Sequence, residues 1–260
     1  MNVTAIKTGV FKEGENLADF VIRYIRNVKK DSVIVITSKI VALSENRTVI
    51  IENKKTKERV IRSESELAIS TKHVWLTVKD GMIMASAGID ESNANGKLIL
   101  LPQNSFRAAL KLRKELMKIY NVKKLGVLIT DSRTMPLRSG VTGVALGYAG
   151  FKGLRDYRGT RDIFGRAFKF SQTNVADSLA ASAVFLMGEG NEQRPLAIIE
   201  KSNIQFCEKV SRKELTISLR DDMYRPLFSL ISRKTLDNRK QECYYYRKST
   251  VQNRNERNDK

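Results

Sequence analysis

The sequence predicts a mixed α/β (α+β) fold, in which helices flank a sheet of parallel and antiparallel strands. Patterns typical of buried strands alternate with amphipathic helical patterns along the chain. Residues 75–88 contain two apolar runs joined by Asp-Gly, which predicts an antiparallel hairpin and favours a mixed sheet over a purely parallel one. With 260 residues, 42% of them hydrophobic and 29% charged, the chain is large enough to bury a substantial core.

The first elements expected are a helix, a strand and a connection. Residues 15–28 predict a helix, and residues 33–37 (VIVIT) predict a buried strand with Ser38 as a candidate cap for a following helix. The apolar face of the first helix carries Leu17, Phe20, Val21, Tyr24 and Ile25. Residues 45–63 are polar and charged around a short VII run, which indicates a hairpin or an exposed connection.

The second half of the chain predicts two longer helices, each followed by a strand. Residues 104–120 form an amphipathic pattern with Lys and Arg on the outer side, and a strand is expected over residues 125–130. The core-facing side chains of this helix are Phe106, Ala109, Leu110, Leu116 and Met117. Residues 173–188 predict a helix that Thr173 or Asn174 caps and Gly188 ends, before a strand over residues 196–200.

The chain is expected to form one folded domain over residues 1–228, followed by a tail. Residues 229–260 lack a sustained apolar period and are crowded with Arg, Lys and Asn, so we expect a basic, disordered segment. No apolar stretch has the length of a signal peptide or a membrane span, and the two cysteines form no metal-binding or disulfide pattern. We therefore expect a cytoplasmic protein that does not enter a membrane.

Acidic residues follow three apolar elements and are the strongest candidates for chemistry. Neither a GxxxxGK[ST] phosphate loop nor a GxGxxG motif after a strand is present. Side chains at the ends of elements converge where a mixed sheet opens a ligand crevice, and carboxylates brought together there would bind Mg²⁺. Each acid taken alone is better explained as a turn residue or a helix cap, and only the three sites together favour a functional role. The three groups are Asp90, Glu91 and Asn93; Asp131 and Ser132; and Glu189 and Glu192.

A glycine-rich and arginine-rich run lies between the second and third acidic groups. Its glycines permit close approach of a ligand or of another element, and its arginines suit phosphate or carboxylate. A solvated loop held by ion pairs explains the arginines equally well. The residues are Gly140, Gly143, Gly147 and Gly150, then Arg155, Arg158, Arg161 and Arg166. Arg133 and Arg138 flank the second acidic group and are further candidates for binding phosphate or a substrate carboxylate.

Several motifs together resemble the gamma-glutamyl ligase family, whose best-known member adds glutamate to the deazaflavin coenzyme F420. They are GIDESN, ITDS, GVTGVALGYAG, DYRGTRDIFGR, NVADSLAASA and MGE, in the family's order from about residue 6 to about residue 200. The resemblance implies a ligase over residues 1–228 with mixed sheets flanked by helices, working as an intertwined homodimer. It also implies a nucleotide-dependent reaction of L-glutamate with a small-molecule acceptor. The co-substrate would be GTP, with ATP as the other candidate. The enzyme would bind Mg²⁺ or Mn²⁺ at two positions, and K⁺ is a further candidate ion.

The resemblance also implies roles for individual residues. The expected metal ligands are Asp90, Asp131, Ser132 and Glu189, and the expected catalytic residues are Asp90, Asp131 and Arg138. The expected nucleotide contacts are Thr8, Gly9, Val10, Phe11, Ser38, Lys39, Asn93, Met187, Gly188, Glu189, Gly190, Asn191, Glu192, Gln193 and Arg194. The family's usual Ser-Lys pair beside the nucleotide is replaced here by Ala42 and Leu43.

The acceptor and one alternative function stay open at this point. DSRTMPLR (131–138) departs from the segment usual in ligases of the deazaflavin and is closer to the branch assigned to folate metabolism, which favours a pterin- or folate-type acceptor. The alternative is an inactive ligase-like scaffold that binds nucleic acid. The net charge of +19 favours it, as do Tyr244, Tyr245 and Tyr246 among the Arg and Lys residues of the tail.

Overall fold

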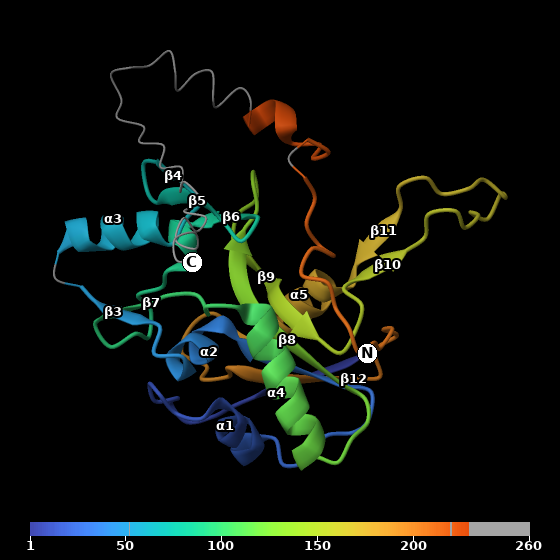
Figure 1. Ribbon diagram of the computed structural model, residues 1–260, viewed down its shortest axis with the longest axis horizontal. Coiled ribbons are helices and arrows are strands. Elements are labelled where there is room, and N and C mark those ends of the chain that lie inside the picture. Colours follow the sequence, from blue (N-terminus) through green and yellow to red (C-terminus); the bar gives the residue numbers. More distant parts are fainter. Residues whose placement is uncertain (52, 219, 229–260) are drawn as a thin grey trace, which may run out of the picture. The chain divides into compact units, whose positions relative to one another are not determined.

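The computed structural model describes residues 1–51, 53–218 and 220–228, and these residues form two compact units (Figure 1). The first unit combines Met1–Val49 with Asp90–Asp221, and the second contains Ile50–Ile89 together with residues 222–228 of the described chain. The expected basic tail over residues 229–260, with its tyrosines, lies outside the described residues. No described helix is both long and apolar enough to cross a membrane.

The first unit is built on a mixed five-stranded sheet, as the alternating patterns predicted. Its strand order is β1-β12-β2-β8-β9, and among these neighbours only β2 and β8 run parallel. The bounds are β1 Asn2–Ile6, β12 Leu196–Glu200, β2 Ser32–Thr37, β8 Leu125–Thr134 and β9 Val141–Ala149. Strand β2 and the first part of β8, residues 125–130, are buried almost throughout, which explains their continuous apolar runs.

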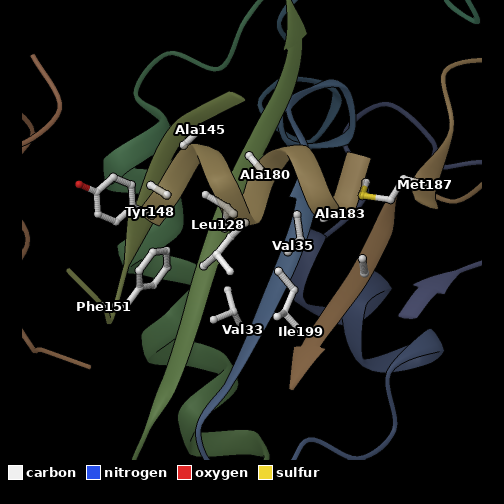
Figure 2. Close-up of a cluster of buried hydrophobic side chains, with 13 residues drawn as sticks. Val33, Val35, Leu128, Ala145, Tyr148, Phe151, Ala180, Ala183, Met187 and Ile199 are labelled. Atoms are coloured by element: carbon white, nitrogen blue, oxygen red, sulfur yellow. The ribbon is translucent and has the colours of Figure 1, made fainter. Parts of the chain in front are cut away.

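Helices α4 (Ser105–Ile119) and α5 (Val175–Met187) cover opposite faces of this sheet, in front of and behind the strands in Figure 1. Figure 2 shows α5 packed against side chains of the sheet that include Val33, Leu128 and Tyr148. Asn174 caps α5 by accepting a hydrogen bond from the Asp177 N–H, and Gly188 ends the helix with φ +84°, both as predicted.

Two of the glycines in the glycine-rich run allow these helices to approach strand β9. A Cβ on Gly143 would lie 2.4 Å from the Ala180 carbonyl oxygen of α5, and a Cβ on Gly147 would lie 2.4 Å from the carbonyl carbon of Ser105 in α4. The register between β8 and β9 shifts between these two glycines, which turns them toward opposite faces of the sheet. The predicted close approach is thus confirmed here, and the approaching groups are helices.

The two short helices of the first unit differ in detail from the prediction. Helix α1 (Leu17–Tyr24) ends earlier than the expected 15–28, and Asn16 caps it. Helix α2 (Ser38–Ser44) follows β2 directly, with Thr37 rather than Ser38 at its N-cap position. Ser38 is therefore the first helical residue, and the prediction that it caps the helix was wrong. Its hydroxyl is instead directed to an acid on β8.

The face that α4 turns to the core also differs from the prediction. Leu110 is 39% exposed, whereas Leu112 and Arg113 are buried. Arg113 is accommodated because its Nε donates to the Leu125 carbonyl oxygen at 2.7 Å, while its two terminal nitrogens donate to Glu208 at 3.0 and 2.8 Å. A hydrophobic pattern cannot reveal a buried arginine whose guanidinium group is satisfied by hydrogen bonds.

A two-stranded arm extends from the first unit (Figure 1). It consists of β10 (Leu154–Asp156) and β11 (Gln172–Asn174), which pair antiparallel, and of the connection between them. Arg158 contacts Asp156 at 2.6 Å, so the ion-pair interpretation of the arginine-rich run is confirmed for this residue. Side chains in the connection are strongly exposed, including Ile163 at 91% and Phe164 at 89%.

The second unit contains a helix and a three-stranded sheet. The hairpin predicted at Asp-Gly is confirmed by Asp80 and Gly81, whose φ values of +51° and +73° suit a tight turn. The hairpin or exposed connection expected over residues 45–63 was wrong. A helix forms there after the Asn53 cap, although it buries only two side chains. The bounds are α3 Lys54–Ser63, β4 Leu67–Ser70, β5 Trp75–Lys79, β6 Met82–Ala85 and a 3₁₀ turn, Ser86–Gly88.

A last pair of short strands borders the region of the acidic residues. Strand β3 (Thr48–Ile50), where the chain leaves the first unit, pairs with β7 (Lys97–Ile99). Asp90 extends this region through a single bridge to Ile99, with N–H to carbonyl oxygen distances of 3.0 and 2.9 Å. This bridge fixes the backbone of the first acidic group.

Candidate active site

The parallel pairing of β2 and β8 brings the start of α2 next to the second acidic group. Thr37 lies opposite Thr130 in this register, so the residues that follow each of them emerge at the same edge of the sheet. The Ser38 hydroxyl donates to Asp131 Oδ1 at 3.3 Å. Strand β8 continues to Thr134, however, so Asp131 stands within a paired strand, opposite Val144, and not after its end as expected.

Asp131 is a carboxyl group that burial keeps from ionising easily. Desolvation raises its pKa to about 6, although the charge of Arg133, the N–H of Ser132 and the Ser38 hydroxyl all act in the opposite direction. The negative charge of Asp90 adds to the rise, which places the two carboxylates within electrostatic reach of each other. The three groups around Asp131 therefore offset the cost of burying its charge only in part.

Asp90 has the opposite balance. Burial works against its ionisation, but hydrogen bonds from Lys39 and from the Ser92 N–H, together with the charge of Lys39, lower its pKa overall. Lys39 Nζ lies 2.8 Å from Asp90 Oδ2, and the Ser92 N–H donates to Oδ1 at 2.6 Å. The second contact closes an Asx turn of the kind that an Asp-x-Ser sequence favours.

Consecutive residues of α2 thus hold the two carboxylates: Ser38 contacts Asp131 and Lys39 contacts Asp90. Two neighbouring carboxylates with a hydroxyl beside them are the oxygen donors that Mg²⁺ or Mn²⁺ prefers, and a cation there would favour the ionised form of the buried Asp131. The residues present therefore fit a divalent metal.

Two of the predicted metal ligands lie apart from this pair. Ser132 follows Asp131 in the strand and so points to the opposite face, the face on which its partner Gly143 meets α5. Glu189 is exposed on the loop after α5. Across residues 1–51, 53–218 and 220–228, no three His, Cys, Asp or Glu side chains gather in an arrangement that could hold a metal. The structure brings two of the three acidic groups together.

The loop over residues 187–194 joins the predicted nucleotide contacts to each other. Thr8 N–H donates to the Gln193 carbonyl oxygen at 2.9 Å, and Asn93 Nδ2 donates to the Gly190 carbonyl oxygen at 3.3 Å. Within the loop, the Gly190 N–H donates to Glu192 Oε2 at 2.8 Å. Because Asn93 follows Asp90 closely in the chain, these bonds connect the loop and the Thr8 turn to the carboxylate pair.

The turn over residues 8–11 is bonded to α1 through Tyr24, a residue for which the sequence predicted no functional role. Gly9 N–H donates to the Tyr24 hydroxyl at 2.9 Å, and the buried Phe11 ring packs edge-on against Phe20 at 4.9 Å between centroids. Val10, at 77% exposure, projects from the turn. Tyr24 and Ser92 are thus additional positioning residues, and of these only Ser92 carried a sequence signal, the Asx pattern.

The remaining predicted residues are spread around this edge. Arg138 lies in the exposed turn between β8 and β9, where its N–H donates to the Met135 carbonyl oxygen at 3.2 Å. Met187, the last residue of α5, is buried in the core, and Asn191 is exposed. Arg194 Nη1 donates to the Leu186 carbonyl oxygen at 3.4 Å. Met187 and Arg194 accordingly hold the loop to the end of α5.

Comparison with known proteins identifies relatives that match most of this chain. The profile of the family described as F420-0:Gamma-glutamyl ligase matches residues 5–201. A protein of Methanococcus maripaludis (strain C6) named coenzyme F420:L-glutamate ligase is 33% identical over 231 residues, which cover 82% of this chain and 92% of the relative. Proteins of the same name from Methanocaldococcus jannaschii and Archaeoglobus fulgidus are 31% and 30% identical. These cover 86% and 83% of this chain, and 97% and 92% of the relatives.

Proposed function

Because the chain belongs to the F420-0:Gamma-glutamyl ligase family, we propose that it joins L-glutamate to a carboxyl group of a coenzyme-type acceptor through a γ-glutamyl amide bond. The observation that carries this proposal is the pair of carboxylates, Asp90 and Asp131, held by consecutive residues of α2 beside the connected loops. Forming an amide from a carboxylate needs an activating group, and a site rich in carboxylates and backbone donors suits a metal-bound nucleoside triphosphate.

The nucleotide is proposed to be GTP, with ATP as the competing co-substrate, and to lie along residues 8–11 and 187–194. Backbone groups of turns are suited to phosphate and base, and Lys39 offers a cation next to them. Mg²⁺ or Mn²⁺ would be held by Asp90 and Asp131, where it would neutralise phosphate charge. Ser132 as a ligand of a second metal, Glu189 as an acidic metal ligand and K⁺ as a further ion remain sequence-based predictions.

The proposed reaction passes through an acyl phosphate. A carboxylate oxygen of the acceptor attacks the terminal phosphorus, and the bond to the nucleoside diphosphate breaks. The amine of glutamate then attacks the acyl carbon, phosphate leaves, and the amine loses a proton. The chain's own contribution is alignment and charge: the loops orient the nucleotide, and Arg133 and Arg138 are proposed to attract phosphate or substrate carboxylates. No protein nucleophile is required.

The acceptor is the finer part of the proposal. The names of the relatives favour the deazaflavin coenzyme F420, whereas the TMPLR segment motivated a pterin- or folate-type acceptor. We therefore propose a direct competition: the purified protein is incubated with both acceptors, labelled glutamate, a nucleotide and Mg²⁺ or Mn²⁺, and the products are identified by mass spectrometry. A glutamate ladder on the deazaflavin alone would rule out the folate prediction.

The homodimer expected from the resemblance is part of the same proposal. The arm carries Ile163, Phe164 and Phe170 at 88% exposure or more, and Phe185 on the outer side of α5 is 85% exposed. Such concentrations of exposed apolar surface are typical of interaction sites, which supports a second copy as the partner. Sedimentation of the full chain tests the assembly.

The reaction class is tested by the variant Asp131→Asn. It removes one of two negative charges from the proposed metal site, and turnover should fall by several orders of magnitude at saturating metal. Unchanged glutamate transfer in this variant would contradict the proposal.

The nucleic-acid alternative is tested by measuring RNA binding and glutamate transfer in the full chain and in a chain that ends at Phe228. RNA binding that vanishes in the shortened chain, while glutamate transfer continues, would assign RNA binding to the tail only.

A further inference from the structure

The ammonium group of Lys39 is enclosed by oxygen atoms of one short loop. Its Nζ lies 2.8 Å from Asp90 Oδ2, 2.9 Å from the Ser92 carbonyl oxygen and 3.1 Å from Ser92 Oγ. An ammonium has three protons to donate, and these three oxygens accept all of them. Carboxylate, carbonyl and hydroxyl oxygens are also the ligands of hard divalent cations. Lys39 therefore occupies the cation position beside Asp90.

The second carboxylate of the pair, Asp131, is contacted by Ser38, the residue before Lys39 in α2. Asp131 accepts a hydrogen bond from the Ser38 hydroxyl, which carries no charge, and the positive charge of Arg133 also acts on it. The Lys39 ammonium, in contrast, is fully engaged by Asp90 and Ser92. A divalent ion between the carboxylates would meet this ammonium as a like charge at short range, which is costly in a partly buried site.

We propose that Lys39 is the resident counter-ion of Asp90, that a divalent metal displaces its ammonium, and that the ammonium then binds a phosphate of the nucleotide. This inference rests on the proposed function, because it takes the carboxylate pair to be the metal site. Without nucleotide, the metal must break three hydrogen bonds of the ammonium and leave it unpaired beside a dication. With nucleotide, phosphate oxygens replace the lost acceptors. Metal and nucleotide therefore bind cooperatively through Lys39, each tightening the other by the same factor.

The test is Mn²⁺ binding to the full chain, measured from the electron paramagnetic resonance signal of free Mn²⁺ with and without GDP. In the wild type, GDP should tighten Mn²⁺ binding. Lys39→Met should tighten Mn²⁺ binding without nucleotide by about tenfold, since the competing charge is gone, and should remove most of the effect of GDP. The matched control Lys124→Met removes an exposed lysine near Asp31, before the opposite end of β8, and should behave as the wild type.

The possible failures are distinguishable. Mn²⁺ affinity that is unchanged or weakened in Lys39→Met, with binding intact in the wild type, overturns the counter-ion role and leaves the proposed function standing. Absence of Mn²⁺ binding in every protein, with or without GDP, overturns both. If Lys39→Met does not fold, Ser92→Ala removes one acceptor of the ammonium and should tighten Mn²⁺ binding in the same direction by a smaller factor. An Mn²⁺ affinity of Ser92→Ala equal to that of the wild type, or below it, would contradict the inference.

Discussion

A buried charge lies near each end of strand β8, Arg113 of α4 at its start and Asp131 toward its other end, and the two have different partners. Near Leu125, the guanidinium of Arg113 is almost fully buried, yet it donates to a carbonyl oxygen and to both oxygens of Glu208. Near the other end, burial raises the pKa of Asp131 to about 6, although the charge of Arg133, the Ser132 N–H and the Ser38 hydroxyl act in the opposite direction. The partners of Arg113 offset its burial, whereas those of Asp131 offset its burial only in part.

This difference separates a structural charge from a functional one. A buried ion with matched partners stabilises the native state only modestly, but removing one partner is strongly destabilising. A buried carboxylate without matched charge lowers stability at neutral pH, and a site of that kind persists where a ligand completes it. This contrast supports the proposal that a bound cation stabilises the ionised carboxylate of Asp131.

The largest expected effect is at the compensated end. Arg113→Met should lower the free energy of unfolding by about 3–4 kcal/mol, because it leaves the buried Leu125 carbonyl oxygen without its donor and removes the partner of Glu208. Urea unfolding at pH 7 measures this, with Lys114→Met, an exposed change on the same helix, as the control. If Arg113→Met lowered the free energy of unfolding no more than Lys114→Met does, the buried arginine would not be stabilised by its partners as proposed.

A smaller effect, of opposite sign, is expected at the other end. The folded-state pKa of Asp131 lies above its unfolded value of about 4, so its contribution is fully present below pH 4 and is lost as the pH rises through about 6. Asp131→Asn should therefore raise the free energy of unfolding at pH 8 by about 2 kcal/mol and leave it nearly unchanged at pH 4.

Glu115→Gln, which removes an exposed carboxylate from α4, serves as the control for that measurement. It should shift stability equally at both pH values. If Asp131→Asn were less stable than the wild type at pH 8, the carboxylate would be compensated by contacts within the fold, and the difference between the two ends would disappear.

The smallest effect concerns Glu208, whose pKa the Arg113 hydrogen bonds lower. Its contribution is present above the unfolded pKa and is lost as the pH falls, the reverse of Asp131. Because its side chain is 74% exposed, Glu208→Gln should cost only about 1 kcal/mol at pH 7 and less at pH 3. If the stability difference between the wild type and Glu208→Gln grew toward pH 3, the ionised Glu208 would not be stabilised by Arg113 as proposed.

Much of the fold and part of the site were predictable because they depend on local patterns. The apolar runs of β2 and β8, the Asp-Gly hairpin and the caps of α5 are all set by neighbouring residues. The pairing of Lys39 with Asp90 joins residues far apart in sequence and follows only from the tertiary arrangement. The same holds for the buried position of Arg113.

Other errors have equally physical causes. The expected hairpin or exposed connection over residues 45–63 is in part helix α3, where Thr56 and Ile61 alone are buried, too few for a hydrophobic period to reveal. Asp131 and Ser132 were expected to act together, but the strand extends past them and strand alternation turns them to opposite faces. Whether Ser132 binds a second ion stays a prediction.

The central claim is that the carboxylate pair binds a divalent metal, and thermal unfolding at pH 8 with and without Mn²⁺ tests it most directly. We predict that Mn²⁺ raises the unfolding temperature of the wild type, because it binds the native state and stabilises the ionised form of the buried Asp131. Asp131→Asn should start from a higher unfolding temperature and gain little from Mn²⁺. An equal gain in both proteins would show that the metal binds elsewhere and would contradict the account.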